Sequence, residues 1–334
     1  MSKRPYSDAS EDSAATAEED LWFLPGPMDE EDEGFQRSPL PKAPTLRAEL
    51  KDWVQAEADN AAQLARAAAV FGALDDRLCH ASQGAALRLA LLEASELSWL
   101  SGDRISVDRL ALWHGLHLAG VQEDAQALTR TGWALRKLAG GPGPEDMAWF
   151  LGRPDAATQE WQDQMAEAEH LHPMTRAAMG YLLWQRVVEG SAAITEGGVV
   201  AARIAATCGR GGALFMPLAQ GGSRALQGGG SIAERLARWL IGAESACLAA
   251  LLHLDRITAW QSRAALALAD LSGRTPALLI TAFASWPVLS GPLAEAQTGA
   301  SRATVQRNID CFVKRGLLRE ITGQGRYRLW AAAL

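Results

Sequence analysis

The stretch SGPLAEAQTGASRATVQRNIDCFVKRG, residues 290–316, decides the fold of the C-terminal region. Ser290 and Ser301 each stand at a predicted helix N-cap, where a hydroxyl accepts a hydrogen bond from a free backbone amide. Gly299 lies in the tight turn between the two predicted helices, where glycine can adopt a positive φ. Gly316 follows the second helix as a C-terminal cap residue. This pattern predicts a helix-turn-helix.

The flanking segments extend this prediction to a larger module. Residues 276–286 (PALLITAFASW) form an apolar helical run that ends at Pro287. After Gly316, residues 317–321 and 327–329 alternate around residues 322–325 (TGQG), which predicts a small β-hairpin. A helix-turn-helix followed by a hairpin is a winged helix-turn-helix. We therefore predict a DNA-binding domain of this type over residues 275–334.

The second helix of this motif has one apolar and one polar face. Its apolar stripe consists of Val305, Ile309, Phe312 and Val313. The opposite face, with the cations of the hairpin, offers donors to phosphates and base edges. The residues expected to contact DNA are Ser301, Arg302, Thr304, Gln306, Arg307, Asn308, Lys314, Arg315, Arg326 and Arg328. Within this set, Arg302, Thr304, Gln306 and Arg307 are the candidates for base edges, and Ser301, Lys314, Arg315, Arg326 and Arg328 are the candidates for phosphates.

Local charge agrees with double-stranded DNA as the partner. Residues 276–334 hold seven Lys or Arg against three acids, whereas the whole chain has a formal net charge of −7. Binding to phosphate depends on local cations, so a basic segment in an acidic chain indicates directed contact with a polyanion. Winged helices also serve as protein–protein modules, and that alternative stays open.

Composition predicts an all-α body before this module. The chain has 334 residues, 48% of them hydrophobic, with much Ala and Leu and few β-branched runs before residue 276. Helical periodicity covers residues 45–78, 86–97, 106–118 and 124–138. A second helical block runs from residue 145 to about 274, with glycine-rich turns predicted at residues 197–198, 209–212 and 221–230. We assign residues 45–274 to this body.

Residues 1–44 differ in composition from the rest. They carry eleven acids against four bases, punctuated by Pro, Ser and Gly, which is typical of a disordered acidic tail. A short apolar island, residues 21–24 (LWFL), lies within it. The island is either a strap that docks on the body, or a peptide that binds a partner or covers the basic face of residues 276–334.

Other signals bear on location and cofactors. The four cysteines have no CxxC spacing, the N-terminus has no apolar signal-peptide core, and no apolar run is long enough to span a membrane. We expect a cytoplasmic protein with reduced thiols. His114 and His117 have a spacing that can chelate a metal but lack further ligands nearby. No Gly-Lys-Ser/Thr phosphate loop, Rossmann fingerprint or HExxH occurs, so no metal or cofactor is expected.

Further stretches bear on the ancestry of the body: residues 96–106 (ELSWLSGDRIS), 171–187 (LHPMTRAAMGYLLWQRV), 196–198 with Arg203, and 317–330 (LLREITGQGRYRLW). Their order resembles the Fic family, whose enzymes transfer AMP to protein hydroxyls. It also resembles an uncharacterised bacterial family with a C-terminal helix-turn-helix. The resemblance implies a Fic-like helical body that carries the winged helix-turn-helix.

The departures from the Fic pattern concern its catalytic groups. The resemblance places the family's histidine base at Ala192, its Phe at Ile194, its acid at Glu196, its Asn-Gly-Arg at Gly198, Val199 and Val200, and its inhibitory glutamate at Ser101. Alanine cannot deprotonate a hydroxyl nucleophile. The anion-binding glycine and arginine are also absent. The resemblance therefore implies a Fic-like scaffold without Fic chemistry.

The sequence thus favours a non-enzymatic transcriptional regulator that binds DNA as a homodimer, with a small molecule or a protein as possible effector. One alternative is a divergent nucleotidyl or phosphoryl transferase of the Fic type that uses His172 or Glu196. Against a catalytic His172, its position just before Pro173 is typical of a helix cap. The other alternative is a protein-interaction module that binds no DNA.

Overall fold

The computed structural model describes residues 46–116, 125–154, 156–188, 190–323 and 328–334. The chain divides into residues 1–44 and one compact unit, Thr45–Leu334, so residues 45–274 and 275–334 lie in the same unit. The described part of this unit is mainly helical, as composition predicts. Among the described helices, none is both long and apolar enough to cross a membrane. The predicted acidic tail, residues 1–44, lies outside the described residues.

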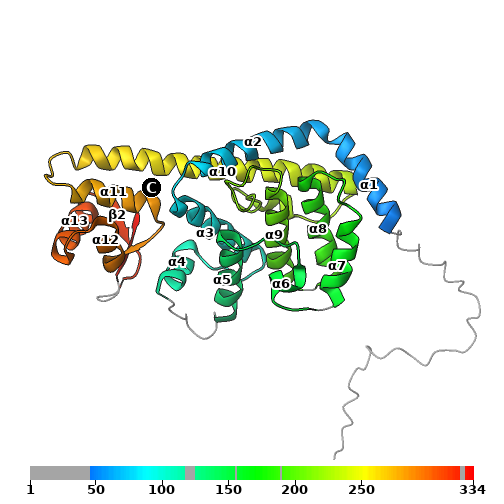
Figure 1. The fold of residues 1–334 in the computed structure, drawn as a ribbon, viewed down its shortest axis with the longest axis horizontal. Helices are drawn as coiled ribbons and strands as arrows, with labels where there is room; N and C mark the ends of the chain where they lie inside the picture. The colour runs from blue at the N-terminus through cyan, green and yellow to red at the C-terminus, as the bar shows by residue number, and fades with distance from the viewer. Residues whose placement is uncertain (1–45, 117–124, 155, 189, 324–327) are drawn as a thin grey trace, which may run out of the picture. The chain divides into compact units, whose positions relative to one another are not determined.

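The first part of the unit is a series of helices joined by short turns (Figure 1). These are α1 (Leu46–Asp59), α2 (Ala61–Cys79), α3 (Gln83–Leu100), α4 (Val107–Leu116) and α5 (Ala125–Ala139). The helices predicted over residues 86–97, 106–118 and 124–138 correspond to α3, α4 and α5. The periodic stretch 45–78 forms two helices, because the chain breaks at Asn60, whose side chain donates to the carbonyl of Ala56 at 2.9 Å.

The next helices are α6 (Met147–Leu151), α7 (Ala156–Ala166), α8 (Pro173–Val187) and α9 (Ser191–Ala206). The turn predicted at residues 197–198 is wrong, since both glycines lie inside α9. They are small because neighbouring helices pack closely against them. A Cβ on Gly197 would lie 3.0 Å from Cδ1 of Trp184 on α8, and one on Gly198 would lie 2.7 Å from Cδ2 of Leu97 on α3.

Helix α10 (Ile232–Ala267) spans 36 residues and contacts α1, α2, α8 and α11 (Figure 1). It begins at a capping box, in which the Ser231 hydroxyl accepts from the Glu234 amide and the Glu234 carboxylate accepts from the Ser231 amide. The short 3₁₀ helix η2 (Ser223–Leu226) packs directly on Gly242. A Cβ on Gly242 would lie 2.2 Å from the backbone nitrogen of Ala225.

Two buried carboxylates hold the glycine-rich chain between α9 and α10. Asp75 on α2 accepts from the backbone amides of Arg210 and Ala213 at 2.6 and 2.7 Å. Glu93 on α3 accepts from three successive amides, at residues 218–220, at 2.9 to 3.2 Å. These carboxylates satisfy backbone donors that burial removes from water. The turns predicted at residues 209–212 and 221–230 are confirmed by positive φ at Gly211, Gly221, Gly222, Gly229 and Gly230.

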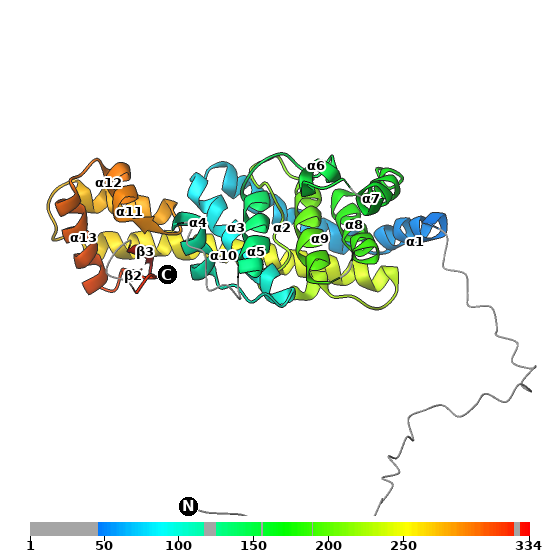
Figure 2. The same ribbon diagram turned by 90° about the horizontal axis from the view of Figure 1, so that it is seen from below.

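The C-terminal segment combines helices with a small sheet (Figure 2). Its elements are α11 (Thr275–Ser285), β1 (Leu289–Ser290), α12 (Gly291–Thr298), α13 (Arg302–Lys314), β2 (Leu318–Glu320) and β3 (Leu329–Ala332). The strands are antiparallel in the order β1-β3-β2, with Leu289 opposite Trp330 and Leu318 opposite Ala332. The strand predicted over residues 317–321 covers β2, whereas the one predicted over 327–329 meets β3 only at Leu329, and the prediction does not include the two-residue strand β1.

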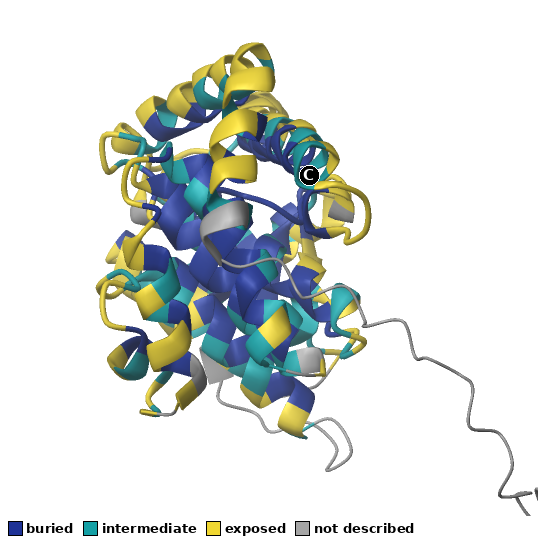
Figure 3. Ribbon diagram, turned by 90° about the vertical axis from the view of Figure 1, so that its right-hand side faces the viewer, coloured by how far each residue is buried: buried dark blue, intermediate teal, exposed yellow. Residues whose placement is uncertain are grey.

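A continuous hydrophobic core runs from the helices into this segment. Figure 3 shows the buried residues concentrated between the packed helices. Trp260 near the end of α10 is fully buried, and its Nε1 donates to the carbonyl of Leu317 at 2.8 Å. Phe283 of α11 and Phe312 of α13 are also fully buried. The core therefore fixes where α13 lies.

Candidate nucleic-acid interface

Helix α13 presents one face to the core and the opposite face to solvent. Val305, Ile309 and Phe312 are buried, as the apolar stripe predicts. Val313, which was assigned to the same stripe, is 37% exposed. It lies at the edge of the stripe, one residue beyond Phe312, so helical geometry turns it outward. The solvent face of α13 is thus the surface on which the predicted contact residues can act.

The N-caps and turn glycines that set the direction of α13 are found where the sequence predicts them. The Ser290 hydroxyl accepts from the Leu293 amide at 3.3 Å, and the Ser301 hydroxyl accepts from the Thr304 amide at 3.4 Å. Gly299 and Gly316 have φ of 62° and 68°. A left-handed residue after α12 reverses the chain within a short turn and starts α13 in a new direction.

Three cations occupy the solvent face of α13: Arg302, Arg307 and Lys314, all exposed. Among the described residues, no acid forms an ion pair with any of them. The Nε of Arg307 donates to the carbonyl of Ala303 at 3.4 Å. Their charges are therefore available to an external anion.

The uncharged polar residues of α13 that are predicted to contact DNA form hydrogen bonds within the helix or with its N-cap. The Thr304 hydroxyl lies 3.0 Å from that of Ser301, Gln306 donates to Asp310 at 2.8 Å, and Asn308 donates to the Thr304 carbonyl at 2.8 Å. Asp310 is exposed on the same face and places one acid among the cations. These groups would have to exchange an internal hydrogen bond for one to a ligand.

Arg315 and Arg328 differ from the three free cations, because each is engaged in an ion pair. Arg315 binds both oxygens of Asp270 at 2.6 and 2.8 Å, which raises the pKa of the guanidinium and lowers that of Asp270. Arg328 pairs with Glu320 and lies 5.2 Å from the ring of Trp330. Arg326 lies outside the described residues.

The C-terminal segment is tied to the body by contacts that no sequence pattern marks. Arg319 of β2 binds both oxygens of Asp108 on α4 at 2.6 and 2.7 Å. Arg263 of α10 donates to the carbonyl of Ala333 at 2.6 Å. Arg88, buried on α3, donates to the carbonyls of Phe283 and Trp286. These contacts come from α3, α4 and α10, so the body holds α13 in a fixed orientation.

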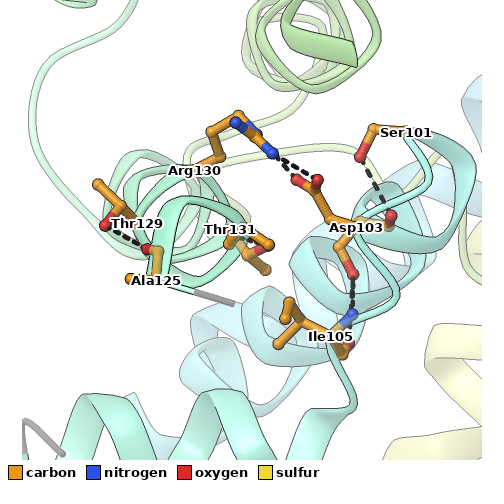
Figure 4. Close-up of polar contacts among 9 residues, drawn as sticks. Ser101, Asp103, Ile105, Ala125, Thr129, Arg130 and Thr131 are labelled. Atoms are coloured by element: carbon orange, nitrogen blue, oxygen red, sulfur yellow. Dashed lines mark hydrogen bonds and ion pairs between the residues drawn. The ribbon is translucent and has the colours of Figure 1, made fainter. Parts of the chain in front are cut away.

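The region that resembles the N-terminal Fic motif forms a tight connection between α3 and α4. Figure 4 shows the Ser101 hydroxyl turned back on its own helix, where it donates to the Ser98 carbonyl at 3.1 Å. Asp103 accepts two hydrogen bonds from Arg130 of α5, at 2.6 and 2.9 Å (Figure 4). The bidentate pair fixes this connection against α5, which is a structural role.

The residues that the resemblance assigns to a Fic catalytic loop all lie within α9: Ala192, Ile194, Glu196, Gly198, Val199 and Val200. Glu196, Gly198, Val199 and Val200 lie beyond the first turn of α9, where backbone amides donate to carbonyls four residues earlier and cannot surround a phosphate. Arg203 donates to the carbonyls of Lys137 and Gly141 at 2.9 and 2.7 Å. The described backbone here thus serves helix packing.

The two residues of the transferase alternative also have structural partners. His172 caps α8, since its Nδ1 accepts from the Met174 amide at 3.2 Å, and burial lowers the pKa of its imidazole. Glu196 binds Arg153 through both oxygens at 2.6 and 2.8 Å. His117 lies outside the described residues. Within those described, no group of three or more His, Cys, Asp or Glu could hold a metal ion.

Comparisons with known proteins add no family. No protein-family model matches the chain. A search of curated proteins also gives no match. The resemblance to the Fic family therefore stays a prediction from the sequence, and the function has to be argued from the geometry of the α12–α13 region.

Proposed function

We propose that this protein is a cytoplasmic transcriptional regulator that binds double-stranded DNA through α13. The observation that carries the proposal is the solvent face of α13, where Arg302, Arg307 and Lys314 have no acidic partner among the residues that the structure describes. A helix of this width fits the major groove, and its exposed cations can neutralise phosphates on either side.

The order of elements supports this proposal. A helix, a short strand, a second helix, a tight turn, a third helix and two further strands follow one another along residues 275–332. This is the order of a winged helix-turn-helix, in which the third helix reads the groove. The N-terminus of α13, which follows the N-cap Ser301, carries backbone amides and a partial positive charge that favour phosphate.

The contacts divide the predicted residues by role. Arg302 and Arg307, with Thr304 and Gln306, lie near the start of α13 and are the proposed base-edge contacts. Lys314 is proposed to bind phosphate. Arg315 and Arg328 are held by Asp270 and Glu320, so we propose that they position the end of α13 and the hairpin, and contact phosphate only if those pairs open.

The body is proposed to be a Fic-like scaffold that no longer performs Fic chemistry. The helix that runs through the loop positions and the structural partners of Glu196 support this view. We also propose a homodimer, because a single small DNA-binding module buries only about 600 to 1,000 Å². Two copies on a two-fold site would double that footprint.

A salt titration of binding to random duplex DNA tests the proposal. The variant R302A/R307A/K314A removes the three free cations of α13. On random DNA no base sequence is selected, so all three cations are expected to neutralise phosphates. Their loss should make the slope of log affinity against log salt shallower by about 2 to 3. Fluorescence anisotropy with a labelled duplex measures both slopes.

The matched control is K51A/R66A/R224A, which removes the same charge from exposed cations of α1, α2 and η2. This control should keep the wild-type slope. An equal change in both triple variants would show that α13 is not the contact surface. Absence of binding by the wild type at low salt would reject DNA as the partner and favour the protein-interaction module.

A further inference from the structure

A cavity lies where the C-terminal segment meets the body. Its volume is about 220 Å³, and its lining comes from α3, α4, α10, β2, β3 and the chain that follows α11 and β3. Most of the lining is apolar, including Leu91, Val107, Ala111, Val288 and Ala331. Small-molecule sites are commonly concave and apolar, with a few polar groups that orient the ligand.

The polar group that matters most in this lining is Arg88. Arg88 is only 5% exposed, and it donates hydrogen bonds to the carbonyl groups of Phe283 and Trp286. Among the described residues, no carboxylate is paired with it. Its Nε is buried without a hydrogen-bond partner. Burial of an unpaired cation is costly, and an anion in the cavity would relieve that cost.

His253 of α10 provides a second polar group on the same cavity. Its Nε2 is buried and has no hydrogen-bond partner among the described residues. The charged groups that act on His253 are Arg88 and Arg256, both cationic. Asp108 and Arg319 also line the cavity, but they neutralise each other in a bidentate pair. Among the described lining residues, Arg88 is thus the charged side chain that has no oppositely charged partner.

We propose that this cavity binds a small organic carboxylate with an apolar body, through the guanidinium of Arg88 and Nε2 of His253. A planar carboxylate matches the fork of a guanidinium, and its single charge balances one cation. Inorganic phosphate fits less well, because it has no apolar part that could pack against Leu91 and Val107. A ligand here touches both α4 and β3, and so bridges the body and the C-terminal segment.

Titration calorimetry of the full chain with benzoate tests the site, with benzamide as a neutral probe of the same shape. Benzoate should bind with one-to-one stoichiometry and at least about tenfold more tightly than benzamide. R88M removes the charge and should weaken benzoate by about tenfold or more. Arg88 also bonds to α11, so V107W, which fills the cavity and keeps Arg88, provides an independent variant with the same expected loss.

The control is V54W, which adds the same side chain at an exposed position of α1 outside the cavity lining and should bind benzoate like the wild type. Equal affinity for benzoate and benzamide would overturn the proposal, as would benzoate binding that survives both R88M and V107W. Undetectable benzoate binding up to about 10 mM would do so too. Displacement of benzoate by inorganic phosphate at equal ionic strength would contradict the claim that the ligand has an apolar body. The titration contains no DNA, so its outcome is independent of the DNA-binding proposal.

Discussion

Glu93 shows how one residue can set the pH dependence of the whole protein. It is fully buried on α3, and its oxygens accept from the amides of Leu218, Ala219 and Gln220. Those amides favour the ionised form, but loss of hydration outweighs them and raises the pKa of the carboxyl to about 7. The folded protein therefore holds a proton on Glu93 that the unfolded chain, with an ordinary pKa near 4.5, has released.

We predict that Glu93 makes the folded state less stable as the pH rises. The folded state binds more protons than the unfolded state between about pH 4.5 and 7, so its stability falls through that window, by about 3 kcal/mol in total. His253 acts in the opposite direction, because its pKa is lowered to about 4 and its contribution grows as pH rises from about 4 to 6.5. The wild type alone would show the sum of these two effects and of those from other groups with shifted pKa values, such as His172 and Asp270.

Comparison with E93Q isolates the carboxyl, because His253 contributes equally to both proteins. Urea unfolding followed by circular dichroism gives the two free energies at pH values from about 4.5 to 8. The stability of the wild type relative to E93Q should fall across this range. E93Q is also expected to lose about 1 to 3 kcal/mol at low pH, since an amide nitrogen must face one of the three backbone donors. A pH-independent difference would contradict the raised pKa.

At the scale of single residues, the sequence predicts those roles that depend on neighbours close along the chain. Ser290, Ser301 and Gly316 are recognisable because a cap acts within three or four positions of the chain. The partners of Arg315 and Arg319 are not, since Asp270 and Asp108 are 45 and 211 residues away. A count of charges in the sequence cannot show that these arginines are paired. In the folded protein, each forms an ion pair with an acid of the body.

At the scale of whole elements, Gly84 controls the contact between α3 and α11. A Cβ on Gly84 would lie 1.2 Å from the backbone oxygen of Ser285, so α3 and the end of α11 touch with no room for a side chain. The neighbouring Arg88 bonds to the carbonyls of Phe283 and Trp286 across the same contact. This contact fixes the start of the segment that carries α13.

We predict that G84A destabilises the protein by about 2 to 3 kcal/mol, because a backbone atom cannot move aside as a side chain can. G72A is the matched control. Gly72 is exposed in α2 and has nothing within 4 Å of an added Cβ, so G72A should stabilise the protein by about 0.5 to 1 kcal/mol. Thermal unfolding of both variants measures the two effects. A loss from G72A equal to that from G84A would show that the α3–α11 contact is not the cause.

Glycines also explain where prediction of elements fails. Gly209–Gly212 and Gly197–Gly198 look alike in sequence, yet only the first is a turn. The second lies inside α9, against Trp184 and Leu97, which come from other helices. Strand β1 is missed for a related reason, since two residues have no periodicity and are defined only by pairing with β3. The cavity beside Arg88 is assembled in the same way, from residues that only the fold brings together.

For the whole molecule, the distribution of charge is uneven. Eleven of the 39 acids and four of the 32 bases lie in residues 1–44, so 28 of each remain in residues 45–334. The formal net charge of −7 thus belongs entirely to the first 44 residues, while the compact unit is neutral. Within that neutral unit, α13 presents three cations that form no ion pair with any described residue. We hypothesise that an acidic segment on the same chain would compete with DNA phosphates for those cations, because the tether gives it a high effective concentration.

We predict that removal of residues 1–44 strengthens binding of residues 45–334 to random duplex DNA. The gain should be largest at low salt and should shrink as salt screens both the internal and the external anion. A full-length control in which the eleven acids become Asn or Gln should bind as tightly as the truncated chain, because the effect depends on charge and not on length. Anisotropy titrations of the three proteins decide between these causes. Unchanged affinity on truncation at low salt would exclude competition by the acidic segment. A gain on truncation that the neutral full-length control does not share would assign the effect to the apolar residues 21–24 or to steric cover.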